Sequence, residues 1–393
     1  MILLGAGASI DAGVPGAYKL TEDIFSQLRG TRRQSEAELF GFVHAKLVER
    51  DVKLGGDPFG TINVEEVYDA LQRLAHRSAD PLSEFVSAWD SGVGAKPFDR
   101  KAFQDALQNA INSAISAAGS GRLAPSDWSM YDKISKPVAD AFAGFHPAAA
   151  GDHTLEPYLE ALAACLTPTD PTPNYLREVV SYAVEDCDII GTLNYDLLIE
   201  KCCQKLGYDF SYGLDVWNAR KTIRFERSDL RLAKLHGSLN WIENGDDVDI
   251  DREPVLFKKR GIIFGGQSSK LVPHGPYLQL RSNFDKRLRE STRFGIIGYS
   301  FQDIHMNALI RQWMATKRKA KLVVLNPSLP SDALNKIGRW FDTENGGVSR
   351  YRVEVVHISK GAKFGIQDFI SELSGEPNPP PPNSQNFGVR TLQ

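Results

Sequence analysis

Four short motifs combine residues that can do chemistry with the end of an expected strand. They are GAGASIDAG at 5–13, GTLNYD at 191–196, KLHGSLNW at 234–241 and GYSFQDIH at 298–305. A glycine-rich turn lets the backbone approach a phosphate, an Asn/Asp pair can orient polar ligand groups, and a histidine can act as a general base. In this order, the motifs predict a single crevice that binds a dinucleotide.

The first motif follows the apolar run 2–4 and predicts a strand, a tight turn and a helix. Gly5 and Gly7 would let the backbone approach a pyrophosphate, and the helix would offer unpaired N–H groups to the same anion. The motif departs from GxGxxG because Ile10 occupies the third glycine position. A second strand with a terminal acidic residue does not follow within about 20 residues, which disfavours a hydride-transfer enzyme. The structural alternative is a simple strand-to-helix turn.

Asn194 and Asp196 follow the apolar run 188–192. They would therefore lie at the carboxyl end of a strand, where open α/β sheets bind ligands. The alternative is that Asp196 caps a helix starting near Leu197 and that Asn194 makes a local turn. Capping and ligand contact do not exclude each other, so both interpretations stay open.

His236 follows the apolar run 231–235 and precedes Gly237, which would leave space beside the imidazole. A lone histidine is usually structural, so a catalytic role depends on the companion motifs. An ordinary imidazole titrates near pH 6.5, which suits a general base at neutral pH.

Two further strand ends carry polar residues. Ser300 and Asp303 match a capping box at the head of a helix expected at 304–317, aimed at the same crevice. Asn326 ends the strand expected at 321–326, where its amide would hold a ribose hydroxyl.

The elements that must position these motifs alternate between strands and helices. Helical stretches such as 197–206 and 304–317 separate compact apolar runs, which occur at 2–4, 188–192, 231–235, 293–298, 321–326 and 352–358. This alternation predicts an α/β, Rossmann-like parallel sheet with helices on both faces.

The sheet-forming ranges leave three other segments. Residues 31–186 carry apolar residues at helical spacing and predict an inserted helical lobe, so that 1–30 and 187–374 form the Rossmann domain. The segment 243–283 is rich in Gly, Asp and basic residues, and we expect a long excursion beyond the sheet. The segment 375–393 contains four consecutive prolines, and we expect a flexible tail.

The composition permits an enzyme and disfavours several other classes. With 393 residues, 42% of them hydrophobic, the chain can bury a full core. A formal net charge of -3 gives no field that would recruit nucleic acid or an anionic membrane. No run approaches about 18 apolar residues and no basic-then-apolar leader opens the chain, so we expect a cytoplasmic protein without membrane contact. The four cysteines lack CxxC spacing and a nearby histidine, which favours buried free thiols over metal ligands or disulfides.

The order of the motifs resembles the sirtuin family, and specifically its bacterial sirtuin-like NADase branch. The resemblance covers 1–30 and 188–358 and depends on GAGAS, TLNYD, HG, GYSF and the Asn-Pro pair at 326–327. It implies that Asn194 and Asp196 line the nicotinamide-ribose pocket and that His236 is the catalytic histidine. It also implies the residues around the rest of the dinucleotide: Gly5, Ala6, Gly7 and Ser9 at the pyrophosphate, and Gly298, Ser300 and Asn326 towards the adenosine half.

Three departures from the sirtuin pattern stand in the sequence. Every cysteine precedes His236, so the four zinc-holding cysteines of protein-deacylating sirtuins are missing and we expect no zinc module and no metal. The Phe-Arg pair of the family is replaced at 16–18, and Leu193 stands where the family has a ribose-contacting Gln. The first departure argues against a cleft for histone-type peptides.

The resemblance implies an NAD+ hydrolase that cleaves the nicotinamide-ribose bond, with NAD+ as its substrate. His236 would activate a water or a ribose hydroxyl, Asn194 would orient it, and Asp196 would bind the carboxamide. The branch implies anti-phage defence by NAD+ depletion and abortive infection, with homo-oligomerisation or a HerA-type hexameric ATPase as partner. An NAD-dependent protein deacylase and a non-catalytic NAD+ or ADP-ribose sensor scaffold remain the alternatives.

Overall fold

The computed structural model describes residues 1–31, 33–75, 155–187, 189–225, 227–251, 260–262, 275–317, 319–327, 329, 353–375 and 390–392. The chain divides into two compact units. Unit 1 consists of Met1–Ile24, Asn63–Tyr68 and Glu160–Gln393, and unit 2 of Phe25–Ile62 and Asp69–Leu159. Every candidate site residue named above lies in unit 1.

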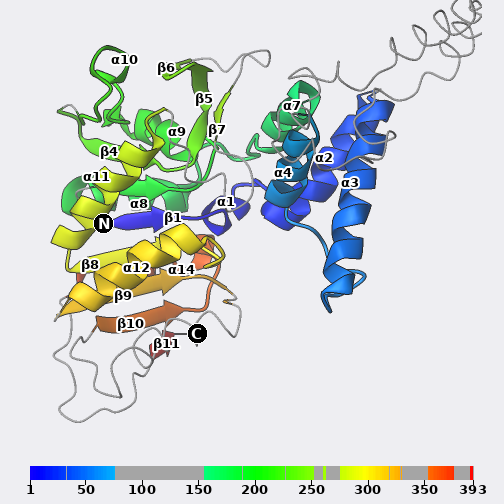
Figure 1. Ribbon diagram of the computed structural model, residues 1–393. Helices are drawn as coiled ribbons and strands as arrows, with labels where there is room; N and C mark the ends of the chain where they lie inside the picture. Colours follow the sequence, from blue (N-terminus) through cyan, green and yellow to red (C-terminus); the bar gives the residue numbers. More distant parts are fainter. Residues whose placement is uncertain are drawn as a thin grey trace, which may run out of the picture. The chain divides into compact units, whose positions relative to one another are not determined.

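Unit 1 is built on an eight-stranded parallel sheet (Figure 1). The central strand β1 (Ile2–Leu4) pairs with β2 (Ile190–Thr192) on one side and with β8 (Arg293–Ile297) on the other. The remaining strands extend these two halves: β4 (Leu230–Lys234) and β3 (Phe210–Ser211) beyond β2, and β9 (Ala320–Leu325), β10 (Val353–Ile358) and β11 (Arg390–Leu392) beyond β8. The strand order reverses at β1, the position where open α/β sheets bind their ligands. The predicted Rossmann-like α/β fold is confirmed.

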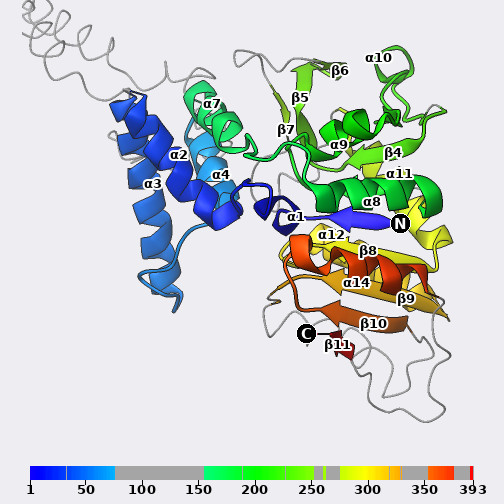
Figure 2. The same cartoon turned by 180° about the vertical axis from the view of Figure 1, so that it is seen from behind.

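Helices cover both faces of the sheet (Figures 1 and 2). One face carries α11 (Tyr277–Glu290) and α12 (Ile304–Thr316), and the other carries α8 (Asn174–Asp186), α9 (Leu198–Leu206) and α14 (Ala362–Ser374). Successive side chains of β8 point to opposite faces of the sheet and so pack against both helical layers. Phe294 stacks edge-on against Trp313 of α12, whereas Gly295 lies directly against Phe369 of α14.

A second, three-stranded antiparallel sheet follows β4. It consists of β5 (Gly237–Asn244), β6 (Asp247–Ile250) and β7 (Arg260–Ile262), with β5 in the centre. Gly237 has a φ of 87°, a left-handed conformation that lets the chain turn from β4 into β5. The long excursion expected over 243–283 contains regular structure in its described residues, since β6, β7 and parts of β5 and α11 fall within it.

Unit 2 is helical in its described residues. It contains α3 (Gln34–Lys53) and adjoining parts of α2 (Ala17–Gly30), α4 (Val64–Ala75) and α7 (Glu156–Cys165). Its core includes Phe40, whose ring stacks on Phe25 at 6.5 Å and on Tyr158 at 6.0 Å between centroids. Residues 76–154 of the predicted lobe lie outside the described residues, and α8, within the predicted lobe range, is an element of unit 1.

The segment predicted as a flexible tail contributes a strand. Arg390–Leu392 form β11, which pairs in parallel with β10 at the edge of the large sheet. This strand could not be predicted from the sequence, because three residues after a proline-rich segment carry no periodic signal. Residues 376–389 lie outside the described part of the chain.

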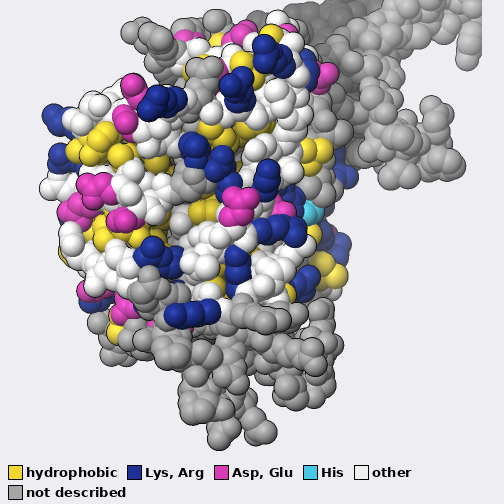
Figure 3. Space-filling view, turned by 90° about the vertical axis from the view of Figure 1, so that its left-hand side faces the viewer, with side chains coloured by type: hydrophobic (Ala, Val, Ile, Leu, Met, Phe, Trp, Pro, Cys, Tyr) yellow, Lys and Arg dark blue, Asp and Glu magenta, His cyan; other side chains and the backbone are white. Residues whose placement is uncertain are grey.

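The surface mixes charges of both signs. Figure 3 shows one face, on which Lys and Arg side chains are interspersed with Asp and Glu side chains. This distribution agrees with the formal net charge of -3. Among the residues that the structure describes, no helix combines the length and the apolar character needed to cross a bilayer.

Candidate functional site

The glycine-rich loop after β1 lies against the loop after β8. The Gly5 N–H donates to Ile297 O at 2.9 Å, and the Gly7 N–H donates to Gly298 O at 2.8 Å. A Cβ on Gly5 or on Gly7 would lie only 2.7 Å from backbone atoms of residues 298–299. Glycine is therefore needed here for the contact between two loops, whereas the sequence analysis assigned it to contact with a pyrophosphate.

Most amides of the first loop are already hydrogen-bonded. The Ala8 and Ser9 N–H groups donate to the carbonyls of Gly5 and Ala6 at 2.9 and 3.0 Å. The helix α1 (Gly7–Ile10) is a single turn, so its dipole can contribute little to anion binding. Ala6 is exposed, and its N–H has no hydrogen-bond partner within the described residues. Of the predicted pyrophosphate residues, Ala6 therefore has an amide available to a phosphate oxygen.

Gly298 supplies a direct test of the loop contact. Its φ is +64°, and a Cβ there would lie 2.1 Å from Ala8 N, whereas Gly245 has the same φ with nothing within 4 Å. Gly245→Ala should cost about 1–3 kcal/mol of unfolding free energy for its left-handed backbone alone. Gly298→Ala should cost clearly more, because the loop after β1 must also move. Chemical denaturation of both variants measures the difference, and equal losses would contradict the close approach.

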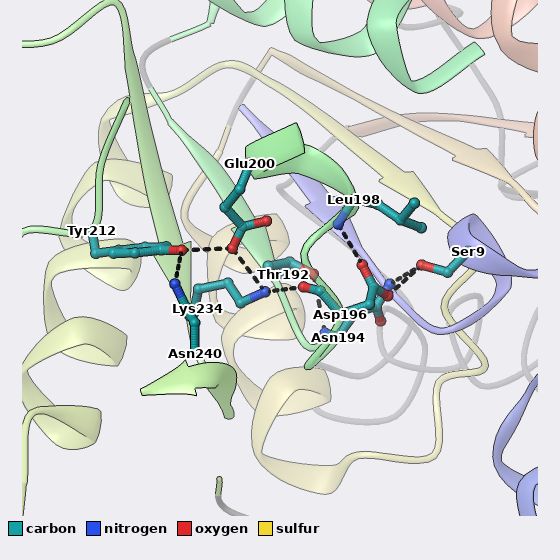
Figure 4. A network of polar contacts seen from close by, with 9 residues as sticks. All are labelled: Ser9, Thr192, Asn194, Asp196, Leu198, Glu200, Tyr212, Lys234 and Asn240. Carbon is teal, nitrogen blue, oxygen red and sulfur yellow. Dashed lines mark hydrogen bonds and ion pairs between the residues drawn. The ribbon is translucent and has the colours of Figure 1, made fainter. Parts of the chain in front are cut away.

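Three predicted residues form one hydrogen-bonded cluster at the ends of β1 and β2 (Figure 4). Asn194 Nδ2 donates to Gly5 O and to Ser9 Oγ, both at 2.9 Å. Ser9 Oγ donates in turn to Asp196 Oδ2 at 2.7 Å. The fold therefore brings Ser9, Asn194 and Asp196 together although 185 positions separate Ser9 from Asn194.

Asp196 also serves the helix that follows it, as the capping alternative expected. Its Oδ1 accepts the Leu198 N–H at 3.1 Å at the start of α9. The side chain is buried, with 5% of the residue exposed. Each carboxylate oxygen can accept a second hydrogen bond, so helix contact leaves Asp196 able to receive a ligand amide.

His236 is paired with an acid that the sequence analysis did not connect to it. His236 Nε2 lies 3.2 Å from Asp303 Oδ2, and 7% and 6% of the two residues are exposed. Asp303 Oδ1 accepts the N–H groups of His305 and Met306, which makes Asp303 the N-cap of α12. The carboxylate is therefore fixed by backbone donors and can hold the imidazole in one orientation.

The predicted capping box of Ser300 and Asp303 is wrong, because Ser300 is not the N-cap of α12. Asp303 is the N-cap of α12, whereas Ser300 lies three residues earlier and is exposed. The signal for Asp303 was present, since an Asp directly before a helix start is a preferred N-cap. Ser300 remains accessible to a ligand from the position that the sequence analysis gave it.

His236 and Asn194 emerge from neighbouring strands at the same edge of the sheet. Thr192 of β2 pairs with Lys234 of β4, so each of the two residues follows its paired neighbour by two positions. The Tyr195 ring lies 6.5 Å from the His236 ring between centroids. Within the described residues no hydrogen bond joins Asn194 to His236 directly, and we predict that a reacting group binds between them.

A buried polar network extends from Asp196 to Glu200 on α9 and Asn240 on β5 (Figure 4). Lys234 Nζ donates to the Asp196 backbone oxygen and lies 3.2 Å from Glu200 Oε1. Tyr212 Oη donates to the same Glu200 oxygen at 2.8 Å, and Asn240 Nδ2 donates to Tyr212 Oη at 3.1 Å. Lys234 therefore ties the loop that carries Asp196 to α9.

Asn326 stands at the predicted strand end, but its side chain is engaged. Asn326 Nδ2 donates to Tyr299 O at 3.0 Å, and its backbone oxygen lies 3.0 Å from His357 Nε2. These contacts join the loop after β8 to the ends of β9 and β10. The amide can contact a ribose through its oxygen, whereas its nitrogen is occupied within the protein.

The cysteines are free thiols in the structure, and burial raises their pKa. Cys202 and Cys203 on α9 are fully buried, and desolvation raises the pKa of each to about 12. No group of three or more His, Cys, Asp or Glu residues in the described ranges could hold a metal ion.

The two α9 thiols should be inert in the native protein. At pH 8 a pKa of about 12 leaves a thiolate fraction of roughly 10⁻⁴, so alkylation by iodoacetamide should be far slower than after unfolding. Because folding raises these pKa values, the neutral thiols impose no penalty below the ordinary thiol pKa. Stability should fall as the pH rises from there towards 12. Mass-spectrometric labelling with and without denaturant checks this, and rapid native labelling would contradict the burial.

Comparison with known protein families gives a match over part of the chain. Residues 188–342 match the family model of the SIR2-like domain. No curated protein matches the chain. A solved structure described as "Structural Basis for the Mechanism and Regulation of Sir2 Enzymes" is 12% identical with a TM-score of 0.32, covering 70% of this chain and 99% of its own. The structure of Sir2Af2 bound to a myristoylated histone peptide is 11% identical with a TM-score of 0.31, covering 56% and 79%.

The matched range contains the residues on which the site depends. Asn194, Asp196, His236 and Asp303 all fall within 188–342, whereas the glycine-rich loop at 5–13 lies outside it. Residues 188–342 are therefore similar to a SIR2-like domain, and they carry the histidine-carboxylate pair and the Asn/Asp motif described above.

Proposed function

We propose that this protein hydrolyses NAD+ at the nicotinamide-ribose bond and releases nicotinamide and ADP-ribose. The observation that carries the proposal is the pairing of His236 with Asp303 at a strand end next to the one that presents Asn194. The similarity of residues 188–342 to the SIR2-like domain supports NAD+ as the substrate.

Cleavage of the nicotinamide-ribose bond requires mainly that the protein position the reactants and stabilise the developing charge. The nicotinamide of NAD+ is cationic and departs as a neutral molecule, so no strong general acid is needed. The site must stabilise an oxocarbenium-like centre at C1′ and direct a nucleophile to it. His236 accepts a proton from the attacking water, and Asp303 orients the imidazole and stabilises the imidazolium that forms.

The residues at the ends of β1 and β2 fit the nicotinamide half of the substrate. Asn194 is half-buried, and its amide oxygen can orient the water or a ribose hydroxyl while its nitrogen is held by Gly5 and Ser9. Asp196 would accept the carboxamide N–H2 group. The exposed Ala6 amide can donate to the pyrophosphate, and the exposed Ser300 side chain can contact the adenosine half.

The chain segment after His236 favours hydrolysis over protein deacylation. In deacylating sirtuins this segment carries a cysteine-held zinc module, whereas here it forms the cysteine-free strands β5 and β6. The missing cysteines argue against the peptide cleft that accompanies such a module. Deacylation is therefore the second candidate rather than the first.

One incubation separates the candidates. Purified protein is mixed with NAD+, with and without an acetylated peptide, and the products are resolved by liquid chromatography and mass spectrometry. The hydrolase should release ADP-ribose and nicotinamide at equal rates in both samples. Peptide-dependent formation of O-acetyl-ADP-ribose would instead identify a deacylase, and binding without turnover would identify a sensor scaffold.

The biological role that we propose is NAD+ depletion during phage infection, leading to abortive infection. Because NAD+ depletion is toxic to the cell, the activity must be inhibited before infection. We propose that homo-oligomerisation or association with a HerA-type hexameric ATPase controls it. Cellular NAD+ should fall after infection in cells that carry the active protein and should not fall with His236→Ala. Light scattering of the purified protein, alone and with such an ATPase, checks the assembly.

A further inference from the structure

A cavity of about 430 Å³ lies beside the network of Figure 4, on the side of α9 and β3. Its polar lining includes Glu200, Tyr212 and Asn240, and its apolar walls include Phe210 and Leu214. Gln204 and Asp215 are exposed members of the lining, so the cavity opens to solvent there. None of the predicted dinucleotide residues lines it.

Two acceptor atoms of this lining have no donor. Glu200 Oε2 and Asn240 Oδ1 are buried and make no hydrogen bond within the described part of the chain. The two residues are only 4% and 8% exposed, so bulk water does not reach these oxygens freely. Buried acceptors are normally satisfied, and two unsatisfied ones on residues that line one cavity indicate donors that a ligand brings once small side-chain rotations turn the oxygens towards it.

The orientation of the Asn240 amide follows from its neighbours. The Tyr212 hydroxyl has one proton, and it donates that proton to Glu200 Oε1 at 2.8 Å. Its oxygen therefore accepts from Asn240, whose nitrogen lies at 3.1 Å. The free end of the Asn240 amide must then be its oxygen, an acceptor.

The charges and walls narrow the class of ligand. Lys234 Nζ lies 3.2 Å from Glu200 Oε1, and Lys234 is not part of the cavity lining. Its charge offsets that of Glu200, so the ligand need not be a cation. The Phe210 and Tyr212 rings stand edge to face, with centroids 5.3 Å apart, and Ile250 completes the apolar wall. Such walls suit a flat ring, and a cavity of this size falls in the range of small-molecule sites.

We propose that this cavity binds a planar nitrogen heterocycle through an exocyclic amino or carboxamide N–H2 group that donates to Glu200 Oε2 and Asn240 Oδ1. An adenine base and nicotinamide share this chemistry. The site is separate from the proposed catalytic centre and does not require that NAD+ be hydrolysed.

Matched ligand pairs test the proposal on the wild-type protein. Adenosine and purine riboside differ by the exocyclic amino group, and nicotinamide and nicotinic acid differ at the carboxamide. By equilibrium dialysis, at least one amino-bearing member should bind roughly 10-fold or more tightly than its partner, because the partner leaves a buried acceptor unpaired. Equal affinities within both pairs, or no binding of either amino-bearing member at about 10 mM, would mean that the cavity holds water only and would overturn the proposal.

Three variants assign the binding to this cavity rather than to the dinucleotide crevice. Ile250→Trp, at a residue 43% exposed, should fill the cavity and weaken binding about 10-fold or more. Asn240→Leu should weaken the amino-bearing ligand selectively, whereas Asn194→Ala should leave this binding unchanged. The opposite pattern, with loss in Asn194→Ala and retention in Ile250→Trp, would place the ligand in the crevice and refute the site. If one cavity variant fails to fold, the other still assigns the ligand, because Ile250 and Asn240 both line the cavity and neither belongs to the crevice.

Discussion

His236→Ala is expected to lower kcat for NAD+ cleavage by about 10²- to 10⁴-fold, the usual contribution of a general base. Asn194→Ala should lower it to a similar extent, because the water or ribose hydroxyl would lose its orienting amide. Neither substitution removes a large part of the core, so both variants should fold. Initial rates of nicotinamide release, with circular dichroism as the check on folding, measure the effect.

Matched controls separate catalysis from general damage. His44→Ala replaces a half-buried histidine of α3, and Asn283→Ala replaces a half-buried asparagine of α11, both remote in sequence from the four motifs. Both should retain normal turnover. Asp303→Asn keeps an acceptor for the His305 and Met306 N–H groups and removes the charge beside His236, so it should reduce kcat with little change in KM. Normal NAD+ consumption by folded His236→Ala and Asn194→Ala would refute the assignment.

Lys234→Ala is expected to reduce the free energy of unfolding by about 3–5 kcal/mol, the typical cost of breaking a buried ion pair. Lys234 and Glu200 have side chains only 1% and 6% exposed, so removal of the lysine strands a carboxylate away from water. The loop that carries Asp196 would also lose its hydrogen bond from Lys234 Nζ. Urea denaturation followed by circular dichroism measures the loss.

A double variant distinguishes the stranded charge from lost packing. Lys234→Met with Glu200→Gln removes both charges and keeps an acceptor for the Tyr212 hydroxyl, so it should recover most of the stability lost in Lys234→Ala. The exposed pair of Lys46 and Glu49, with side chains 60% and 47% exposed, supplies the control. Lys46→Ala should cost at most about 1 kcal/mol. A double variant no more stable than Lys234→Ala would contradict a dominant charge effect.

Most of the large sheet could be predicted because all its strands except β3 and β11 are short apolar runs separated by helices. The run 231–235, for example, became β4 at Leu230–Lys234, and 321–326 became β9 at Ala320–Leu325. A parallel strand that is buried on both faces is apolar along its whole length, so its own composition is enough to identify it. The boundaries moved by one or two residues, as helix and strand ends usually do.

The second sheet was missed although β5 shows a usable pattern. Leu239 and Trp241 are buried and alternate with polar residues, a period of two that indicates a strand. The surrounding Gly and Asp residues obscure this pattern, because Gly245 belongs to the tight turn between β5 and β6.

Side-chain partnerships were the least predictable part of the site. Motif order placed Ser9 and Asn194 at strand ends, yet only the register of β1 against β2 brings them to 2.9 Å. The pairing of His236 with Asp303 likewise depends on where α12 begins. Gly5 and Gly7 were recognised as requiring close approach, but the partner that approaches is another loop of the protein.

The contact between the loops after β1 and β8 limits how the proposed dinucleotide site can be engineered. Where Gly5, Gly7 and Gly298 meet, main-chain atoms fill the space that side chains would need, so this floor cannot be reshaped by substitution. In the proposed dinucleotide site, selectivity for different nucleotides would instead have to be altered from the walls, through exposed positions such as Ser300. A mutant library that spares the floor and varies those walls should yield folded proteins at a much higher frequency than one spread evenly over both.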